Sequence, residues 1–534
     1  MHLSMNSGSP GDRDAARDLH NRAVARYQAA DRAGAAALLG DAVAADPDCP
    51  EAHASLGVVL RELGRLPESR TALERAAQLA PHDPECQANL GVTLYQMQEF
   101  DRSLDHLERA AALGSENSLA FFALGLLRHR MRRHEAALDA YGRAIELDPR
   151  NANAWLNRGA ALHRTGRSLE ALAHFDRVAD LRGADSGLLV NRAAALARLG
   201  RFDEALADYA QAQSLGLRDA DVRYPRSLIL LLRGDLTQGW LEHESRWERT
   251  GAPSRRHAAI TPWRGEPLAG RRILLWSEQG YGDTVQFCRY ALALKAQGAE
   301  VILDVQRPLT RLLASLDAQI EVIAEGAPPP RVDFQAPLLS LPLLLGTRLE
   351  TIPAPVPYLQ PDPQRLRSWH ARLPAHTGRI RVGLAVAGNP EHLNDGARSA
   401  PLAALVPLAA RADVFLLQKE IRDADRVVLD AMPAMRWMGG ELQDFADTAA
   451  LAQQLDLIIS VDTSLAHVAG ALGKPGWLLL PRIPDWRWMM ETDLSPWYPT
   501  LRLFRQQVDG DWAGVVRRVL AALDEIGPTL VPAA

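Results

Sequence analysis

The first half of the chain repeats itself every 34 residues. Glycines recur at that interval at Gly57, Gly91, Gly125 and Gly159. A unit of this length holds two helices, and one helical pair cannot bury its apolar face alone, so copies of the unit must stack on one another. The period therefore predicts an all-helical solenoid that presents a recognition surface.

A period of 34 residues is that of the tetratricopeptide repeat. The first unit begins near Asp14, and in later units Ala193 and then Ser227 replace the ladder glycine. We predict a flexible tail over residues 1–13 and a tetratricopeptide array of six to seven repeats over residues 14–250, whose last unit serves as a cap. The ladder glycines are expected to allow close packing of helices and to take no part in chemistry.

Composition narrows the classes of function. The formal net charge of −5 gives no basic field for a nucleic acid backbone, so no nucleic acid partner is expected. The cysteines Cys49, Cys86 and Cys288 are scattered without metal-ligand spacing, so neither a metal site nor a disulfide framework is expected. The N-terminus lacks the apolar core of a signal peptide, and no run of about 18 apolar residues occurs. We expect a cytoplasmic protein without membrane insertion.

The pattern of apolar and polar residues changes after the repeats. Residues 251–271 are rich in Pro and Gly and form a predicted linker. Apolar runs such as RILLW, EVILDV, IRVGLAVA, DVFLLQ and LDLIISV then alternate with helical stretches, which is typical of an α/β domain with parallel sheets. A Pro-rich span near residues 342–363 divides the runs. We predict two Rossmann-like lobes, over residues 272–375 and 376–534.

The first candidate motif is RILLWSEQGYGDT. The loop with Gly280 and Gly282 follows a predicted strand, and parallel α/β sheets bind ligands at the carboxyl ends of their strands. Asp283 would stand at the edge of that crevice. The alternative is that Asp283 only caps the following helix.

The next two motifs also follow predicted strands. GNPEHLNDGARSAPL is a long polar loop that carries Asn394 and Arg398. This loop either binds a ligand or is an ordinary surface loop without a binding role. DVFLLQKE ends in Lys419, which favours an anionic partner at the sheet edge unless this lysine is simply solvated.

The fourth motif, LDLIISVDTSLAHVAGALGKP, is the most specific. Its strand ends at Val461, and Asp462, Thr463 and Ser464 turn into a helix that carries His467. Free amides at a helix N-terminus, together with hydroxyl groups, suit phosphate oxygens. His467 is either part of that site or a buried structural histidine. An aromatic group downstream is either core packing or a wall for base or sugar stacking, and its members are Trp486, Trp488, Trp497 and Tyr498.

These motifs, with the terminal run PDWRWMMETDLSPWYPTLRLFRQ, resemble the transferase domain of bacterial tetratricopeptide-repeat glycosyltransferases. The chain is similar in outline to family 9, the heptosyltransferases, and it shares its repeat-plus-transferase architecture with protein O-GlcNAc transferases and repeat-containing flagellin glycosyltransferases. The resemblance implies a GT-B fold in which residues 272–375 form the acceptor lobe and residues 376–534 the nucleotide-sugar lobe.

The resemblance also implies roles for particular residues. A Gly-Asp pair after the first strand supplies the catalytic aspartate of heptosyltransferases, and it matches Gly282 and Asp283. Their Asp-Thr turn with a following histidine binds the donor phosphates and sugar, and it matches Asp462, Thr463 and His467.

A basic group often neutralises the departing diphosphate in this family. Lys419 is the nearest match, and Arg398 is a second candidate. The chain also departs from the pattern, because Val386 stands where relatives commonly have Trp and Gly396 where they often have Arg. Loss of an aromatic wall and of an arginine at these positions would alter donor choice or weaken activity.

The predicted function is transfer of a sugar from a nucleotide-sugar to Ser or Thr of a protein held by the repeat groove. Asp283 would act as general base in an inverting, metal-independent displacement without a cofactor. Two alternatives stay open: a non-catalytic repeat scaffold with a degenerate transferase domain, and a transferase acting on a lipid-linked saccharide or polysaccharide.

Overall fold

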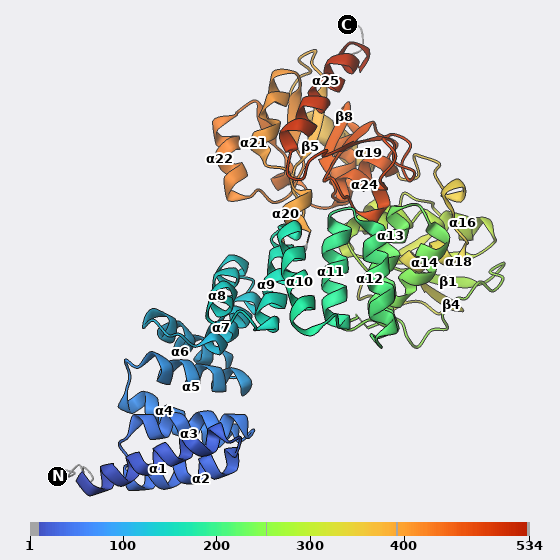
Figure 1. Cartoon of the computed structure of the whole chain (residues 1–534). Coiled ribbons are helices and arrows are strands. Elements are labelled where there is room, and N and C mark those ends of the chain that lie inside the picture. Colours follow the sequence, from blue (N-terminus) through green and yellow to red (C-terminus); the bar gives the residue numbers. More distant parts are fainter. Residues whose placement is uncertain (1–9, 253, 391–393, 531–534) are drawn as a thin grey trace, which may run out of the picture. The chain divides into compact units, whose positions relative to one another are not determined.

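The computed structural model describes residues 10–252, 254–390 and 394–530. The chain divides into two compact units, residues 1–215 and residues 216–534. The first unit is a stack of antiparallel helical pairs (Figure 1). Its helices are α1 Pro10–Gln28, α2 Arg32–Ala45, α3 Pro50–Glu62, α4 Leu66–Leu79, α5 Pro84–Gln96, α6 Phe100–Ala112, α7 Ser118–Arg130, α8 His134–Leu147, α9 Ala152–Arg164, α10 Ser168–Arg182, α11 Ser186–Arg198 and α12 Phe202–Ser214.

The ladder glycines lie where the two helices of a pair touch. A Cβ atom built on Gly57 would come within 2.4 Å of the Leu73 side chain, and one on Gly125 within 2.5 Å of the Tyr141 ring. Asx side chains start several of these helices; Asn117, for example, accepts a hydrogen bond from the Ala120 amide. The period thus reflects packing and capping, as the sequence predicted. α1 begins at Pro10, inside the segment assigned to the tail.

The second unit opens with the helical pair α13 Asp219–Leu232 and α14 Leu236–His243, followed by the 3-10 turn η1 Glu244–Trp247. The sequence places this pair in the repeat array, yet α13 packs on η7 Trp486–Trp488 of the α/β region. Its position in the second unit follows from that packing.

Two parallel sheets form the rest of the unit. The first has the order β3-β2-β1-β4 and the second β10-β9-β8-β5-β6-β7. The strands are β1 Arg272–Trp276, β2 Glu300–Val305, β3 Glu321–Ala324, β4 Phe334–Pro337, β5 Arg381–Ala385, β6 Asp413–Leu416, β7 Met435–Trp437, β8 Leu457–Val461, β9 Gly476–Leu480 and β10 Leu501–Arg505.

Helices connect the strands of both sheets. They are α15 Tyr281–Phe287, α16 Tyr290–Ala296, α17 Thr310–Leu313, α18 Leu341–Leu344, α19 Pro363–Arg372, α20 Asp395–Arg398, α21 Leu402–Leu405, α22 Asp423–Ala431, α23 Phe445–Gln453, α24 Ser464–Ala471 and α25 Trp512–Leu530. α19 lies before the predicted lobe boundary at residue 375, but it packs on α23 of the second lobe, and Trp369 donates to Asp447 over 3.0 Å.

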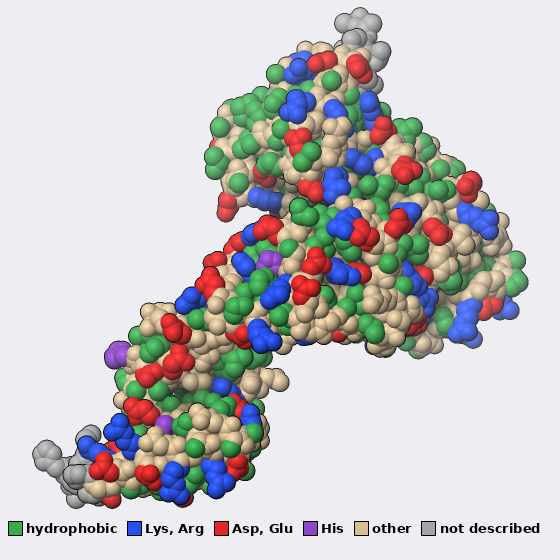
Figure 2. Space-filling view, viewed as in Figure 1, with side chains coloured by type: hydrophobic (Ala, Val, Ile, Leu, Met, Phe, Trp, Pro, Cys, Tyr) green, Lys and Arg blue, Asp and Glu red, His purple; other side chains and the backbone are tan. Residues whose placement is uncertain are grey.

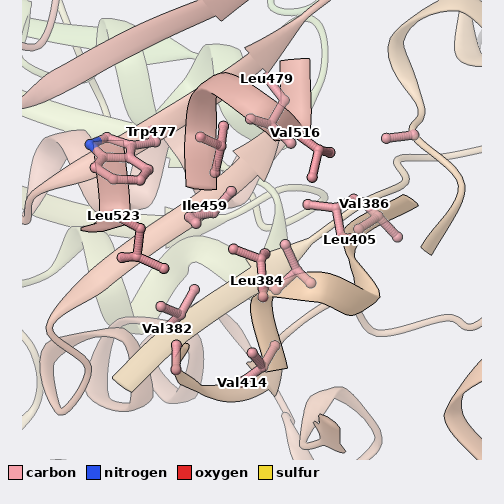
Figure 3. Close-up of a cluster of buried hydrophobic side chains, with 14 of the residues drawn as sticks. Val382, Leu384, Val386, Leu405, Val414, Ile459, Trp477, Leu479, Val516 and Leu523 are labelled. Atoms are coloured by element: carbon pink, nitrogen blue, oxygen red, sulfur yellow. The ribbon is translucent and has the colours of Figure 1, made fainter. Parts of the chain in front are cut away.

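The core of the second lobe packs beside the central strands (Figure 3). Val382 and Leu384 of β5 meet Ile459 of β8, and burial on both faces explains why these strands are continuously apolar. Val386 lies in the same core, fully buried, and its amide donates to Gln418 Oε1 over 2.9 Å. Val386, which stands where the resembled transferases commonly have Trp, therefore packs in the core.

Candidate functional site

The strand order of the second sheet reverses between β5 and β8, and we call the carboxyl-end edge at this reversal the β5–β8 crevice. The chain runs from β5 to β6 and β7 on one side, and then returns to β8 on the other side. Ligands of open α/β sheets bind at such a reversal, outside the carboxyl ends of the strands. The loop after β5 leads to Gly388, and β8 leads directly to Asp462. Two motifs from distant parts of the sequence are thus brought to one edge.

Arg398 lies over Gly388 in this crevice. A Cβ atom on Gly388 would be 2.5 Å from the Arg398 guanidinium, so only glycine leaves room for this side chain. Asp395, which is buried, accepts hydrogen bonds from Ser399 over 2.9 Å and from Arg422 over 2.5 Å. These bonds fix the short helix α20 and thereby the position of Arg398.

Asp462 is the titratable group that directly follows β8 at this edge. Burial raises the pKa of its carboxyl group to about 6, and the nearby charge of Asp485 adds to the rise, whereas Arg487 and Arg398 oppose it. A carboxyl group with this pKa is close to half protonated near pH 6 and suits hydrogen bonds to hydroxyl groups. Of the cations near Asp462, Arg487 was missed by sequence reasoning.

The helix after Asp462 begins as the sequence predicts. Thr463 is the N-cap residue of α24, and its hydroxyl lies 3.0 Å from Ser460 Oγ. Ser464 is the first helical residue and is partly exposed. The first amides of a helix have no partner within the helix, so this end of α24 offers donors toward the crevice.

His467 lies behind this turn and is buried. Its Nδ1 is 3.0 Å from the Tyr498 hydroxyl, and its ring packs 5.3 Å from that of Trp488. Burial holds the pKa of His467 well below its usual value, so the imidazole is neutral. A Cβ atom on Gly282 would lie 2.6 Å from His467 Cδ2. The glycine loop of the first lobe therefore rests on this histidine.

Asp283 meets Arg487 across the two lobes. Arg487 Nη2 donates to Asp283 Oδ1, and the same guanidinium donates to Gln286 over 3.1 Å and to Asp485 over 2.7 Å. Asp283 Oδ2 also accepts from the Gly280 amide over 2.9 Å. The carboxylate thus caps α15, as one reading of the sequence held, and it also forms a buried ion pair at the boundary of the two lobes.

Other contacts close the same boundary. Arg289, which is buried, donates to the Trp497 carbonyl over 2.8 Å and to the Tyr358 hydroxyl over 2.9 Å. Trp488, Trp497 and Tyr498 are fully buried, so the aromatic group predicted as either core or wall forms core here. Sequence reasoning missed Arg289 and Arg487, since arginines are frequent in this chain and neither belongs to a recognised motif.

Two predicted donor residues lie apart from these contacts. Lys419 follows β6, is exposed, and forms no ion pair within the described ranges 10–252, 254–390 and 394–530. Asn394 occupies the N-cap position of the short helix α20, where its side chain makes no capping hydrogen bond. His392 of the same loop lies outside the described residues. Lys419 therefore stands at the margin of the candidate site. The other predicted residues lie near the carboxyl ends of β1, β5 and β8; they are Asp283, Arg398, Asp462, Thr463, Ser464 and His467.

Family models describe the repeats. A tetratricopeptide-repeat model matches residues 20–84, 89–141 and 190–253, and a second model of this repeat matches residues 133–166. The N-terminal region is thus built of tetratricopeptide repeats, which serve protein–protein interaction.

Charges of both signs are interspersed on the face of the molecule shown in Figure 2.

One curated relative matches more than half of the chain. Protein FlbA of Caulobacter vibrioides is 28% identical over 330 residues, which cover 57% of this chain and 55% of FlbA. The chain therefore spans about half the length of this curated relative.

Solved structures are similar to part of the chain. Pseudomonas aeruginosa PilF is 20% identical, covers 39% of this chain and 94% of its own, and has a TM-score of 0.35. YrrB, described as a TPR protein with an unusual peptide-binding site, is 20% identical, covers 33% of this chain and 92% of its own, and has a TM-score of 0.31. None of the helices in the described part of the chain is long and apolar enough to cross a membrane.

Proposed function

We propose that the chain is a glycosyltransferase that uses a nucleotide-sugar and modifies Ser or Thr of a protein held by the repeats. The observation that carries this proposal is the joint placement of Arg398, Asp462 and the N-terminus of α24 at the β5–β8 crevice. A GT-B transferase would bind its donor at this position of the second sheet. The repeats supply a surface of the kind that binds proteins.

Each group in the crevice has a chemistry suited to one part of such a donor. The amides at the start of α24 and the Arg398 guanidinium would hold the diphosphate. Asp462 would hydrogen-bond a ribose or sugar hydroxyl, because a carboxylate beside phosphate oxygens would repel them. Charge that gathers on the leaving diphosphate would be stabilised by the same donors.

Asp283 is the proposed general base, and its partner sets a condition on that role. Arg487 already occupies Asp283 Oδ1 with a hydrogen bond, so an acceptor hydroxyl would have to replace this guanidinium to reach the carboxylate. Arg487 would then be free to turn toward the departing diphosphate. The proposal thus couples acceptor binding to the release of a cation for the leaving group.

The same ion pair favours a second function. If Arg487 never leaves Asp283, the pair is structural and the domain is a non-catalytic part of a repeat scaffold. The buried Val386, where relatives commonly have an aromatic residue, is consistent with this alternative.

A transfer assay separates the two functions. The purified chain is incubated with UDP-, GDP-, ADP- and CMP-sugars, in turn with proteins and with saccharides of the organism that encodes it, and products are analysed by mass spectrometry. A sugar added to Ser or Thr of a protein by the wild type, and lost in Asp283→Asn, supports the proposal. Sugar added only to saccharides would assign a different acceptor, and no product with any donor would favour the scaffold.

A further inference from the structure

A cavity of about 190 Å³ lies at the carboxyl edge of the first sheet, apart from the crevice described above. In the order β3-β2-β1-β4 the chain reverses between β1 and β4, and Trp276 at the end of β1 pairs with Pro337 at the end of β4. Both residues line the cavity. The cavity therefore occupies the position at which a parallel α/β sheet places a ligand.

Three indoles form its apolar surface. Trp276 is fixed because its Nε1 donates to Gln335 Oε1 over 2.6 Å, and Trp263 because its Nε1 donates to the Glu266 carbonyl over 2.8 Å. Trp247 packs with its ring centroid 5.6 Å from that of Trp276. Rigid aromatic walls lose little conformational entropy when they contact a ligand.

Two polar side chains of the cavity wall each have one atom that makes no hydrogen bond with the described residues. Gln335 is 5% exposed, and its Nε2 makes no hydrogen bond to any described residue. Glu244 uses Oε1 for Arg246 and Ser340, while its Oε2 has no partner among the described residues. Both atoms are therefore free to form hydrogen bonds with a ligand or with water in the cavity.

We propose that this cavity binds one neutral pyranose ring. Such a ring offers hydroxyl groups that both accept from Gln335 Nε2 and donate to Glu244 Oε2, and it presents an apolar C–H face to an indole. The volume is below the roughly 300 Å³ at which sites for drug-sized ligands begin, so a whole nucleotide-sugar does not fit. Arg255 and Arg264 line the cavity beside Glu244, so its wall carries charged groups of both signs.

The cavity wall is joined to the loop that carries Asp283. Arg246 donates to Ser340 over 2.8 Å and forms two hydrogen bonds of 2.9 Å with Glu278, which lies between β1 and the glycine loop. A ring bound against Glu244 and Ser340 would thus be recognised by groups of the acceptor-side lobe. The binding itself requires no transfer reaction, so it stands or falls independently of the proposed function.

The test is binding of methyl pyranosides of glucose, galactose, mannose and N-acetylglucosamine to the full chain, followed by calorimetry and saturation-transfer NMR. Trp247→Ala removes a wall, and Arg255→Ala changes an exposed lining side chain whose guanidinium lies 5.3 Å from the Trp247 ring centroid. Trp155→Ala is the matched control, because Trp155 is a partly exposed tryptophan of the first unit.

Saturable one-site binding of a pyranoside is expected, with a Kd raised about tenfold in Trp247→Ala, raised severalfold in Arg255→Ala and unchanged in Trp155→Ala. If Trp247→Ala does not fold, the Kd of Arg255→Ala for the pyranoside is the measurement that tests the proposal. Absence of binding by every pyranoside overturns the proposal, and so does binding that neither variant weakens. Preferential binding of N-acetylserinamide or N-acetylprolinamide would assign the cavity to a peptide side chain and would also overturn it.

Discussion

Arg487 donates a hydrogen bond to Asp283 from the opposite lobe, 204 residues further along the chain. Both side chains are largely buried, at 9% and 15% exposure. The pair joins the candidate catalytic carboxylate to the lobe that carries the candidate donor crevice. Breaking it is therefore expected to change both the stability of the second unit and its function.

Arg487→Met is expected to destabilise the second unit by about 3 kcal/mol, since it leaves Asp283 and Asp485 without their cation in a buried setting. Arg482→Met is the control. Arg482 pairs with Asp509 at 3.2 Å on the surface, and loss of an exposed pair costs about 1 kcal/mol or less. Thermal unfolding of both variants measures the difference, and equal shifts would contradict a buried, structural ion pair.

Asp462→Asn is expected to change stability in a pH-dependent way. The folded protein holds the pKa of Asp462 at about 6, above its ordinary value of 3.8, so the native state binds this proton more tightly than the unfolded chain does. The resulting stabilisation is present below about pH 4 and is lost as the pH rises through about 6.

The amide variant lacks this titration and should be more stable than the wild type at pH 8, with the advantage vanishing near pH 4. Two pKa units correspond to about 3 kcal/mol, and partial exposure screens the carboxyl, so about 1–2 kcal/mol is expected. Melting curves at pH 4, 6 and 8 test this. A variant that is less stable than the wild type by the same amount at every pH would rule out the raised pKa.

Gly282→Ala is expected to destabilise the second unit by about 1–3 kcal/mol, because its Cβ would meet the buried His467 ring at 2.6 Å. Gly396→Ala is the matched control, since a Cβ there meets nothing within 4 Å. Thermal unfolding compares the two. Equal stability of the two variants would show that the glycine loop does not rest on His467.

Two glycines of the first unit should respond to alanine with opposite signs. Gly125→Ala drives a Cβ to 2.5 Å from the Tyr141 ring and is expected to cost about 1–3 kcal/mol. Gly40 lies inside α2 with open space around it, and Gly40→Ala should stabilise by about 0.5–1 kcal/mol through helix propensity. Chemical denaturation followed by circular dichroism tests both, and loss of stability in Gly40→Ala alone would contradict the packing described.

Local patterns in the sequence predicted the main elements. The 34-residue ladder predicted the helical stack, and the runs RILLW and LDLIISV correspond to β1 and β8. The strands β3, β4, β7 and β10 were not predicted. β3 and β7 are short and largely lack buried side chains, so they carry no continuous apolar signal.

The candidate site was predictable only where a strand and its following loop are adjacent in sequence. Asp283 and Asp462 were proposed in this way, and their roles remain predictions. Arg487 was not proposed, because its position beside Asp283 arises from the docking of two lobes, and a single sequence records no such contact. The burial of Val386 likewise depends on which face of β5 meets the core.

Ligand-induced thermal stabilisation tests the central claim, a nucleotide-sugar site at the β5–β8 crevice, most directly. The wild type, Asp283→Asn and Arg398→Ala are melted with UDP-, GDP-, ADP- and CMP-sugars. One donor at about 100 times its Kd should stabilise the wild type by about 2.7 kcal/mol, with the shift kept in Asp283→Asn and reduced in Arg398→Ala. No shift with any donor at millimolar concentration, or a shift that Arg398→Ala leaves unchanged, would contradict a donor site at this crevice.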